Sequence, residues 1–335
     1  MAKPKPGLGL VMLSFGGAPL ARNSEFVREA EALGYTALWI PEVVGPDAFI
    51  SLAAYALNTS KIELGTGVVP IQLRTPGIMA MSFLTLNELS GGRALAGLGV
   101  SSPAIVERWH GASYRKPVTA MRECVEIMRQ LFTEGRAKFE GWIYKSDFRL
   151  GMRLTQKPPR IYLAALNPPM LQVAGEIADG VLFNYSPPEA MPELINQVRS
   201  SAIAAGRDPD EIDIGAYVRM CVTEDERAAT DAFKRELAGY AFVDSYRQMF
   251  ERYGLGDEMA EVRRLWQAGK RDEAFTAIGD ASAAKLGVVG SKEKAREYVA
   301  RFRSAGVTHP IIFPIGPPDT IIRDFANTMR AMAGA

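Results

Sequence analysis

Short apolar runs alternate with longer amphipathic segments along the whole chain. Most of these runs are rich in Val, Ile, Leu and aromatic residues and are bounded by polar or turn residues, so we expect strands. A helical pattern follows most of them, for example over 23–33, 48–57, 76–89 and 118–132. The expected strands are GLGLVML (7–13), TALWIP (36–41), KIELGTGVV (61–69), RALAGLGV (93–100), IYLAAL (161–166), GVLFNY (180–185), IDIGAYVRM (212–220) and HPIIFP (309–314).

Eight strand–helix units within 335 residues predict a (β/α)₈ TIM barrel. A doubly wound open sheet would show the same signals, and it stays an alternative at this stage. No linker or low-complexity stretch divides the chain, so residues 1–335 are expected to form a single domain. Gly34, Gly206 and Gly306 each close a helix ahead of a strand, where a left-handed residue turns the chain back.

Proline pairs follow three of the expected strands, in the stretches Asn167-Pro-Pro, Ser186-Pro-Pro and Gly316-Pro-Pro. Each resembles a helix N-cap with proline in the first helical turn. We therefore expect a helix to begin directly at each of these three prolines.

Residues 223–285 depart from the regular alternation. The segment is helical in composition and is interrupted by glycines at 254, 256, 269 and 279. A barrel tolerates such an excursion best in a βα loop at its C-terminal face, where active sites lie. We expect a helical cap inserted after strand seven, with most of its aromatic residues forming a small core.

The stretch ELGTGVVPIQLRTP (63–76) begins as a buried strand and then becomes irregular. Glycines stand at 65 and 67, and Pro70 cannot donate to a sheet ladder. This combination predicts a bulge at the rim of the barrel, where the backbone can approach another group closely.

Composition excludes several classes of function. Lys and Arg (39) nearly balance Asp and Glu (38), which argues against nucleic-acid or membrane-surface binding. The apolar patch over residues 8–13 is too short for a signal sequence or a membrane span, so a cytoplasmic protein is expected. Cys124 and Cys221 are expected to be reduced, and the two histidines stand apart in the sequence, so no metal site is expected.

Common catalytic and nucleotide-binding motifs are absent from the sequence. The stretch GLGVSS (97–102) lacks the third glycine of a dinucleotide fingerprint, and there is no P-loop or GxSxG motif. Chemistry supplied by a bound cofactor is therefore favoured over nucleophilic hydrolysis.

Three motifs in this order carry a resemblance to a known family: LGTGVVP…RTP (64–76), LSGGR (89–93) and AGEIADG (174–180). The chain resembles the luciferase-like monooxygenase superfamily, and within it the branch that uses the deazaflavin coenzyme F420. The resemblance implies a (β/α)₈ barrel with insertions and a non-prolyl cis peptide at Gly67–Val68 against the cofactor ring. FMN is the alternative cofactor.

The resemblance also implies the cofactor site, with the coenzyme phosphate near the start of the helix at Asn167. Because prolines remove two backbone donors there, the N–H of Met170 or Leu171, or the Asn167 amide, would have to bind the phosphate. The implied cofactor-binding residues are Gly67, Val68, Arg74, Gly99, Ser101, Ser102, Ala164, Ala165, Asn167, Pro168 and Asn184.

Two positions depart from the dehydrogenases of this branch. Glu42-Val43 stands where they carry Asp-His, and Ser102 stands where they carry an acid. A reductase that moves a hydride between deazaflavin C5 and a small organic substrate is therefore expected, with Glu42 hydrogen-bonded to the substrate or the ring. Tyr185 and Tyr217 are further candidate catalytic donors.

Two other functions stay open, an FMN-dependent two-component monooxygenase and a non-catalytic deazaflavin-binding protein. A homodimer is expected from the superfamily alone.

Overall fold

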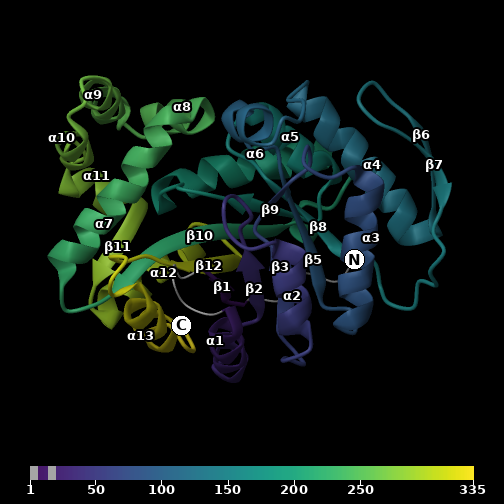
Figure 1. Cartoon of the computed structure of the whole chain (residues 1–335), viewed down its shortest axis with the longest axis horizontal. Coiled ribbons are helices and arrows are strands. Elements are labelled where there is room, and N and C mark those ends of the chain that lie inside the picture. Colours follow the sequence, from purple (N-terminus) through teal and green to yellow (C-terminus); the bar gives the residue numbers. More distant parts are fainter. Residues whose placement is uncertain (1–6, 14–19) are drawn as a thin grey trace.

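Eight parallel strand positions close into a barrel in the computed structural model, which describes residues 7–13 and 20–335 (Figure 1). Pairing of β9 with β10 completes the ring, so the closed barrel is confirmed and the open sheet is excluded. In ring order the strands are β10 (Asp213–Val222), β12 (His309–Pro314), β1 (Gly9–Val11), β2 (Ala37–Ile40), β3 (Glu63–Thr66) with its continuation β4 (Val69–Pro70), β5 (Ala94–Gly99), β8 (Arg160–Ala164) and β9 (Gly180–Phe183).

A helix follows each strand position and packs on the outside of the barrel. The helix expected over residues 76–89 has those bounds in the structure. Gly34, Gly206 and Gly306 have φ of 88°, 73° and 97°, so each adopts the expected left-handed conformation. Within the described ranges, no helix combines the length and apolarity that crossing a bilayer requires. The helices are α1 (Leu20–Ala32), α2 (Ala48–Ala56), α3 (Pro76–Leu89), α4 (Pro117–Glu134), α5 (Pro168–Ile177), α6 (Met191–Ala204), α12 (Lys292–Ser304) and α13 (Ile321–Ala331).

The first proline pair begins an α-helix, the second begins a 3₁₀-helix, and the third is followed by a turn. Asn167 caps α5, with proline in its first turn. After Ser186, Pro187 stays extended (ψ 152°) because proline follows it, a 3₁₀-helix covers Pro188–Ala190, and α6 begins at Met191. After Gly316 the chain forms a turn, closed by a bond from the Thr320 N–H to the Pro317 carbonyl, and α13 begins at Ile321.

Aromatic side chains fill the interior of the barrel. The Trp39 and Tyr162 rings meet edge to face at 5.1 Å, and the Trp39 indole N–H donates to His309 Nε2 at 3.1 Å. A Cβ on Gly65 would lie 2.6 Å from the Trp39 ring, so only glycine leaves room for the indole. Burial lowers the pKa of His309, which is consistent with a neutral imidazole accepting that bond.

Two of the three motifs behind the family resemblance, LSGGR and AGEIADG, hold the N-terminal rim of the barrel together. Arg93, in the LSGGR turn before β5, donates to the carbonyl oxygens of Ser90, Ile62, Ala56 and Thr59. Asp179, in the AGEIADG turn before β9, accepts from the Ile161 N–H at 2.7 Å and from Arg129 at 2.8 Å. These side chains connect neighbouring units and lie away from the strand ends where a site is expected.

The excursion after β10 forms the cap, which we define as residues 223–290. Strand β11 pairs with the C-terminal half of β10, while the helices gather at the left of Figure 1. Phe250 is fully buried in the core of the cap, whereas Phe242 is 46% exposed. The elements of the cap are α7 (Glu226–Gly239), α8 (Asp244–Arg252), α9 (Gly256–Gln267), α10 (Arg271–Thr276), α11 (Asp280–Leu286) and β11 (Gly287–Gly290).

An antiparallel hairpin that the strand pattern did not predict follows α4, at the side of the barrel opposite the cap (Figure 1). It consists of β6 (Arg136–Glu140) and β7 (Lys145–Arg149). The buried carboxylate of Glu123, on α4, accepts N–H bonds from Trp142, Ile143 and Tyr144 at 2.7, 2.9 and 2.9 Å. Burial alone would raise the pKa of Glu123, but these three bonds outweigh it and lower the pKa.

We expect Glu123→Gln to lower the free energy of unfolding by roughly 1–3 kcal/mol, because an amide cannot accept all three N–H bonds. The pKa of Glu123 is lower in the folded chain than the ordinary 4.5. The stabilisation is therefore complete above pH 4.5 and disappears as pH falls through the folded value. Urea unfolding of both proteins from pH 7 downwards measures this difference. Glu126→Gln, on the exposed face of α4, is the control, and an equal loss there would contradict the assignment.

Candidate active site

The strand that starts at Glu63 contains a bulge. Leu64 and Gly65 pair with Ala94 and Leu95 of β5, but farther along Val69 pairs with Leu98. Four steps along β3 and β4, from 65 to 69, therefore face three steps along β5, from 95 to 98. Thr66 fills the gap in the ladder, since its hydroxyl donates to the Gly97 carbonyl at 2.6 Å and accepts from the Gly97 N–H at 3.0 Å. The predicted bulge is confirmed, and we call residues Thr66–Val68 the bulge.

Glycine is required at two positions around the bulge. A Cβ on Gly67 would lie 2.4 Å from the Tyr217 hydroxyl, and one on Gly99 would lie 2.5 Å from Val68 Cγ2. The Tyr217 hydroxyl donates to the Gly67 carbonyl at 2.9 Å. The Gly67–Val68 peptide is cis, as the family resemblance implies, and both residues are half-buried. Half-exposed backbone is thus presented at the C-terminal rim, where a flat ring can approach it.

Glu42 follows β2 and forms an ion pair with Arg74. Its Oε2 lies 3.0 Å from Arg74 Nη2 and accepts the Ala48 N–H at 3.0 Å, while Oε1 contacts Arg74 Nη1. Arg74 also pairs with Asp47 at 2.7 Å, and its hydrogen bond with Glu42 is the main cause of its raised pKa. Asp47 caps α2 by accepting from the Ile50 N–H at 2.8 Å. Both oxygens of Glu42 are therefore occupied by contacts within the protein.

Asn184 and Tyr185 belong to a buried cluster around Arg219. The Arg219 guanidinium lies 3.4 Å from the Tyr185 ring centroid and 4.2 Å from that of Phe313. Its Nε donates to Glu236 of the cap at 2.8 Å, and its Nη1 donates to Asn184 Oδ1 at 2.7 Å. The Tyr185 hydroxyl donates to the same Glu236 oxygen. We call these five residues the arginine cluster.

The charge on Arg219 is compensated by the groups around it. Burial by itself lowers the pKa of Arg219, but Tyr185 and Glu236 outweigh this effect and raise the pKa overall. Burial also raises the pKa of Tyr185 and of Tyr217 above the usual range for tyrosine. Arg219 was not singled out from the sequence, because IDIGAYVRM is typical of a buried strand and nothing local marks one arginine as partnered.

The end of β5 lies beside the bulge. Gly99 pairs with Pro70, and its carbonyl accepts the Ile71 N–H at 3.0 Å. Ser101 adopts a left-handed conformation (φ 56°), and the buried Ser102 precedes a π-helix at Ala104–Trp109. These predicted cofactor residues therefore lie on the same rim as Gly67.

The start of α5 differs from the expectation for a phosphate site. The Met170 N–H donates to Asn167 Oδ1 at 3.2 Å and to the Asn167 carbonyl, and the Leu171 N–H donates to that carbonyl at 3.0 Å. The expectation of a free N–H at Met170 or Leu171 is therefore wrong, because the first helical turn and its cap use both. Pro168 has no N–H, so the Asn167 amide nitrogen is the donor that this cap leaves for a ligand.

A cation that the sequence did not indicate lies next to this cap. Arg252, at the end of α8, donates to the Leu166 carbonyl at 2.7 Å. Ala164 and Ala165 precede this point at the end of β8, and the methyl group of Ala164 lies near Gly99. The cap therefore brings a positive charge to the strand end where the phosphate was expected. Arg252 is 86 residues away from Leu166 in sequence, so no local pattern could have connected them.

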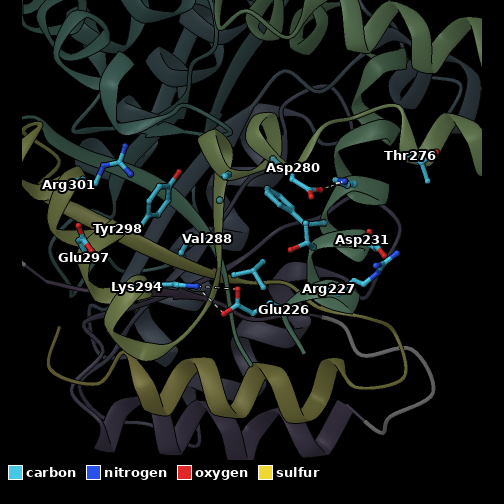
Figure 2. Close-up of a pocket in the computed structure, with 17 residues that line it drawn as sticks. Glu226, Arg227, Asp231, Thr276, Asp280, Val288, Lys294, Glu297, Tyr298 and Arg301 are labelled. Atoms are coloured by element: carbon cyan, nitrogen blue, oxygen red, sulfur yellow. Dashed lines mark hydrogen bonds and ion pairs between the residues drawn. The ribbon is translucent and has the colours of Figure 1, made fainter. Parts of the chain in front are cut away.

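A cavity of about 850 Å³ lies elsewhere, between α7, α11, β11 and α12 (Figure 2). Its walls carry the ion pairs Lys294–Glu226 and Lys234–Asp280, and no predicted site residue lines it. Among the described residues, no group of three or more His, Cys, Asp or Glu side chains could hold a metal ion. Cys124 and Cys221 are buried free thiols. The strand ends around Gly67 therefore remain the candidate site.

Comparisons with known proteins agree with this geometry. The family model for luciferase-like monooxygenases matches residues 8–309. A Mycobacterium tuberculosis protein named as a coenzyme F420-dependent oxidoreductase is 32% identical, over 91% of this chain and 94% of that protein. The 5,10-methylenetetrahydromethanopterin reductase of Archaeoglobus fulgidus is 33% identical, over 87% of this chain and 89% of its own length.

A solved structure supports the same assignment. The coenzyme F420-dependent tetrahydromethanopterin reductase of Methanopyrus kandleri superposes with a TM-score of 0.84 and 25% identity, over 99% of this chain and 98% of that chain. The resemblance that the sequence motifs suggested is confirmed. With a barrel bulged at Gly67 and a family model that covers most of its length, the chain belongs to the luciferase-like monooxygenase family.

Proposed function

We propose that this protein is a coenzyme F420-dependent oxidoreductase that reduces a small organic acceptor. The observation that carries the proposal is the bulged backbone at Gly67 and Val68. Glycine is required at 67 and 99, because a Cβ at either position would lie less than 3 Å from a neighbouring side chain. Relatives that the chain matches over most of its length are named for F420. Bound at this rim, reduced deazaflavin would supply a hydride from its C5 carbon.

The residues around the bulge suit a ligand with a flat ring and an anionic tail. Gly67 and Val68 would face the ring, and Gly99, Ser101 and Ser102 would flank it. Toward the phosphate-bearing side chain, the chain offers Ala164, Ala165, Pro168 and the Asn167 amide. The Arg252 guanidinium, held at the Leu166 carbonyl, supplies the positive charge that a phosphate prefers.

The predicted proton donors are all held by other protein groups. Tyr217 donates to the Gly67 carbonyl, Tyr185 donates to Glu236, and Glu42 is paired with Arg74. An acceptor that needs no proton from the protein therefore suits the site best. A cationic iminium is such a group, because its carbon accepts a hydride while the electrons of the C=N bond become the lone pair on nitrogen. A relative named as a methylenetetrahydromethanopterin reductase is consistent with this class.

Four side chains then act by positioning. Glu42 holds the Arg74 guanidinium at the rim, where Arg74 can meet an anionic part of the cofactor. Tyr217 fixes the Gly67 carbonyl in the bulge. Asn184 accepts a hydrogen bond from Arg219, and the ring of Tyr185 packs against its guanidinium, so together they hold Arg219 in place. Catalysis would depend on orienting donor and acceptor in a site that excludes water.

Titration of the purified protein with F420 and, separately, with FMN tests the cofactor. We expect F420 to bind at least about tenfold more tightly, which corresponds to about 1.4 kcal/mol. Fluorescence of each cofactor is the measurement. Tight FMN binding with no response to F420 would instead support the two-component monooxygenase. Binding of F420 without turnover of iminium, enone or alcohol substrates would support a carrier.

Substitution of Glu42 tests whether it is a proton donor. We expect Glu42→Gln to weaken F420 binding by roughly three- to tenfold through a loosened Arg74, and to leave the shape of the pH profile of kcat unchanged. Arg74→Lys should produce a similar loss. Asp47→Asn, which keeps the Glu42–Arg74 pair, is the control. If Glu42→Gln removes one limb of the pH profile, Glu42 is the donor and the positioning role is wrong.

The α2–α3 face is the surface that we propose for a homodimer. Ile50 on α2 is 75% exposed and Ile78 on α3 is 53% exposed, and large apolar side chains this exposed favour burial against a partner. Other exposed apolar residues of these helices and of the residues that follow them are Leu57, Met81 and Leu89.

We expect the double substitution Ile78→Lys and Met81→Lys to convert the dimer to a monomer, because two charges would have to be desolvated in the interface. Light scattering after size-exclusion chromatography gives the mass. Ile203→Lys, at an apolar position on α6 that is 63% exposed, is the control and should leave the mass unchanged. A double variant that is still dimeric would show that another surface carries the contact.

A further inference from the structure

A buried charge pair crosses the boundary between the barrel and the cap. Arg219 extends from β10 and is 1% exposed, and its partner Glu236 comes from α7. A buried cation is tolerated only when an opposite charge and hydrogen bonds compensate it. Among the described residues, the carboxylate that pairs with Arg219 is that of Glu236, on α7 of the cap. The charge compensation of Arg219 therefore depends on the position of α7.

Side-chain contacts continue from Arg219 to the bulge. Phe313 lies under the Arg219 guanidinium at 4.2 Å, and its ring meets the Tyr217 ring at 6.0 Å and nearly at right angles. The Tyr217 hydroxyl then holds the Gly67 carbonyl at 2.9 Å. The contact at the end of this path is tight, because a Cβ on Gly67 would lie 2.4 Å from the Tyr217 hydroxyl. Phe313, in the middle of the path, is half-buried.

We propose that Arg219 is a positioning residue that couples docking of the cap to the position of the bulge, an inference that rests on the proposed function. Glu236 neutralises Arg219 from the cap side, and Phe313 and Tyr217 transmit its position to Gly67. A shift of α7 would move the guanidinium, then the two rings, and then the carbonyl. By this route the cap influences cofactor binding through residues that do not touch the cofactor, in addition to Arg252, which the proposed function places at the phosphate.

The test compares Glu236→Gln, which removes the charge but keeps the size, with Arg235→Met as a matched control. Arg235 is also on α7, and its guanidinium lies over the ring of Phe275, at 5.0 Å, instead of over a ring of the arginine cluster. The first measurement is amide hydrogen exchange of the cofactor-free protein. We expect exchange in the segment 67–71 to accelerate roughly three- to thirtyfold in Glu236→Gln and to stay unchanged in Arg235→Met.

The second measurement is the Kd for F420. Glu236→Gln should weaken binding by about tenfold, and Glu236→Asp, which keeps the charge, should recover most of that loss. Combining Glu236→Gln with Tyr217→Phe should weaken binding by less than the product of the two single effects, because both act on the Gly67 carbonyl. Phe313→Leu keeps the charges of Arg219 and Glu236 but removes the ring between Arg219 and Tyr217. It should therefore weaken F420 binding to a similar degree, even if Glu236→Gln folds poorly.

The inference would be overturned if Glu236→Gln accelerated amide exchange in α7 but left exchange over 67–71 unchanged. It would also be overturned if the Kd of the double variant changed by the full product of the two single effects. Failure of the proposed function is a separate result. If wild-type protein does not bind F420, exchange in the cofactor-free protein still shows whether cap and bulge are coupled.

Discussion

The hydrogen bond between the Tyr217 hydroxyl and the Gly67 carbonyl joins opposite sides of the barrel, and the shape of the candidate site depends on it. The bulge exists because β3 and β4 contain one residue more than β5 over the same span. A barrel interior already filled by Trp39 and Tyr162 leaves no room for that residue to turn inward. The extra backbone therefore emerges at the rim, where Tyr217 fixes one carbonyl.

The two rims of the barrel are built for different purposes. At the N-terminal rim, Arg93 and Asp179 satisfy backbone groups of neighbouring units, so the polar side chains there serve folding. At the C-terminal rim, glycine, serine and alanine leave the backbone accessible. This division is the usual one in (β/α)₈ barrels, whose strand ends carry the site. The motifs that identify the family lie mainly at the stabilising rim, which is why they indicate the fold more firmly than the substrate.

Two arginines at the C-terminal rim are paired with carboxylates of the protein. The carboxylate of Glu42 binds the guanidinium of Arg74, and the carboxylate of Glu236 binds the guanidinium of Arg219. Such pairs hold elements in place, because breaking one leaves an uncompensated charge in a poorly solvated position. The site is therefore organised for positioning rather than for proton transfer, and cofactor chemistry suits that organisation. The arginine cluster also makes the cap part of the site's framework.

The eight barrel strands, the helix-closing glycines, the bulge and the family could be predicted from sequence, because each depends on local periodicity or on a short motif. It did not reveal the β6–β7 hairpin, the late starts of α6 and α13, or the use of the Met170 and Leu171 N–H groups. Folding of the chain set the partners of Glu42, Tyr185 and Tyr217, and it brought Arg219 and Arg252 to the rim. These contacts escape local patterns because their members are far apart along the chain: the hydrogen bond from Tyr217 to Gly67 joins residues 150 positions apart.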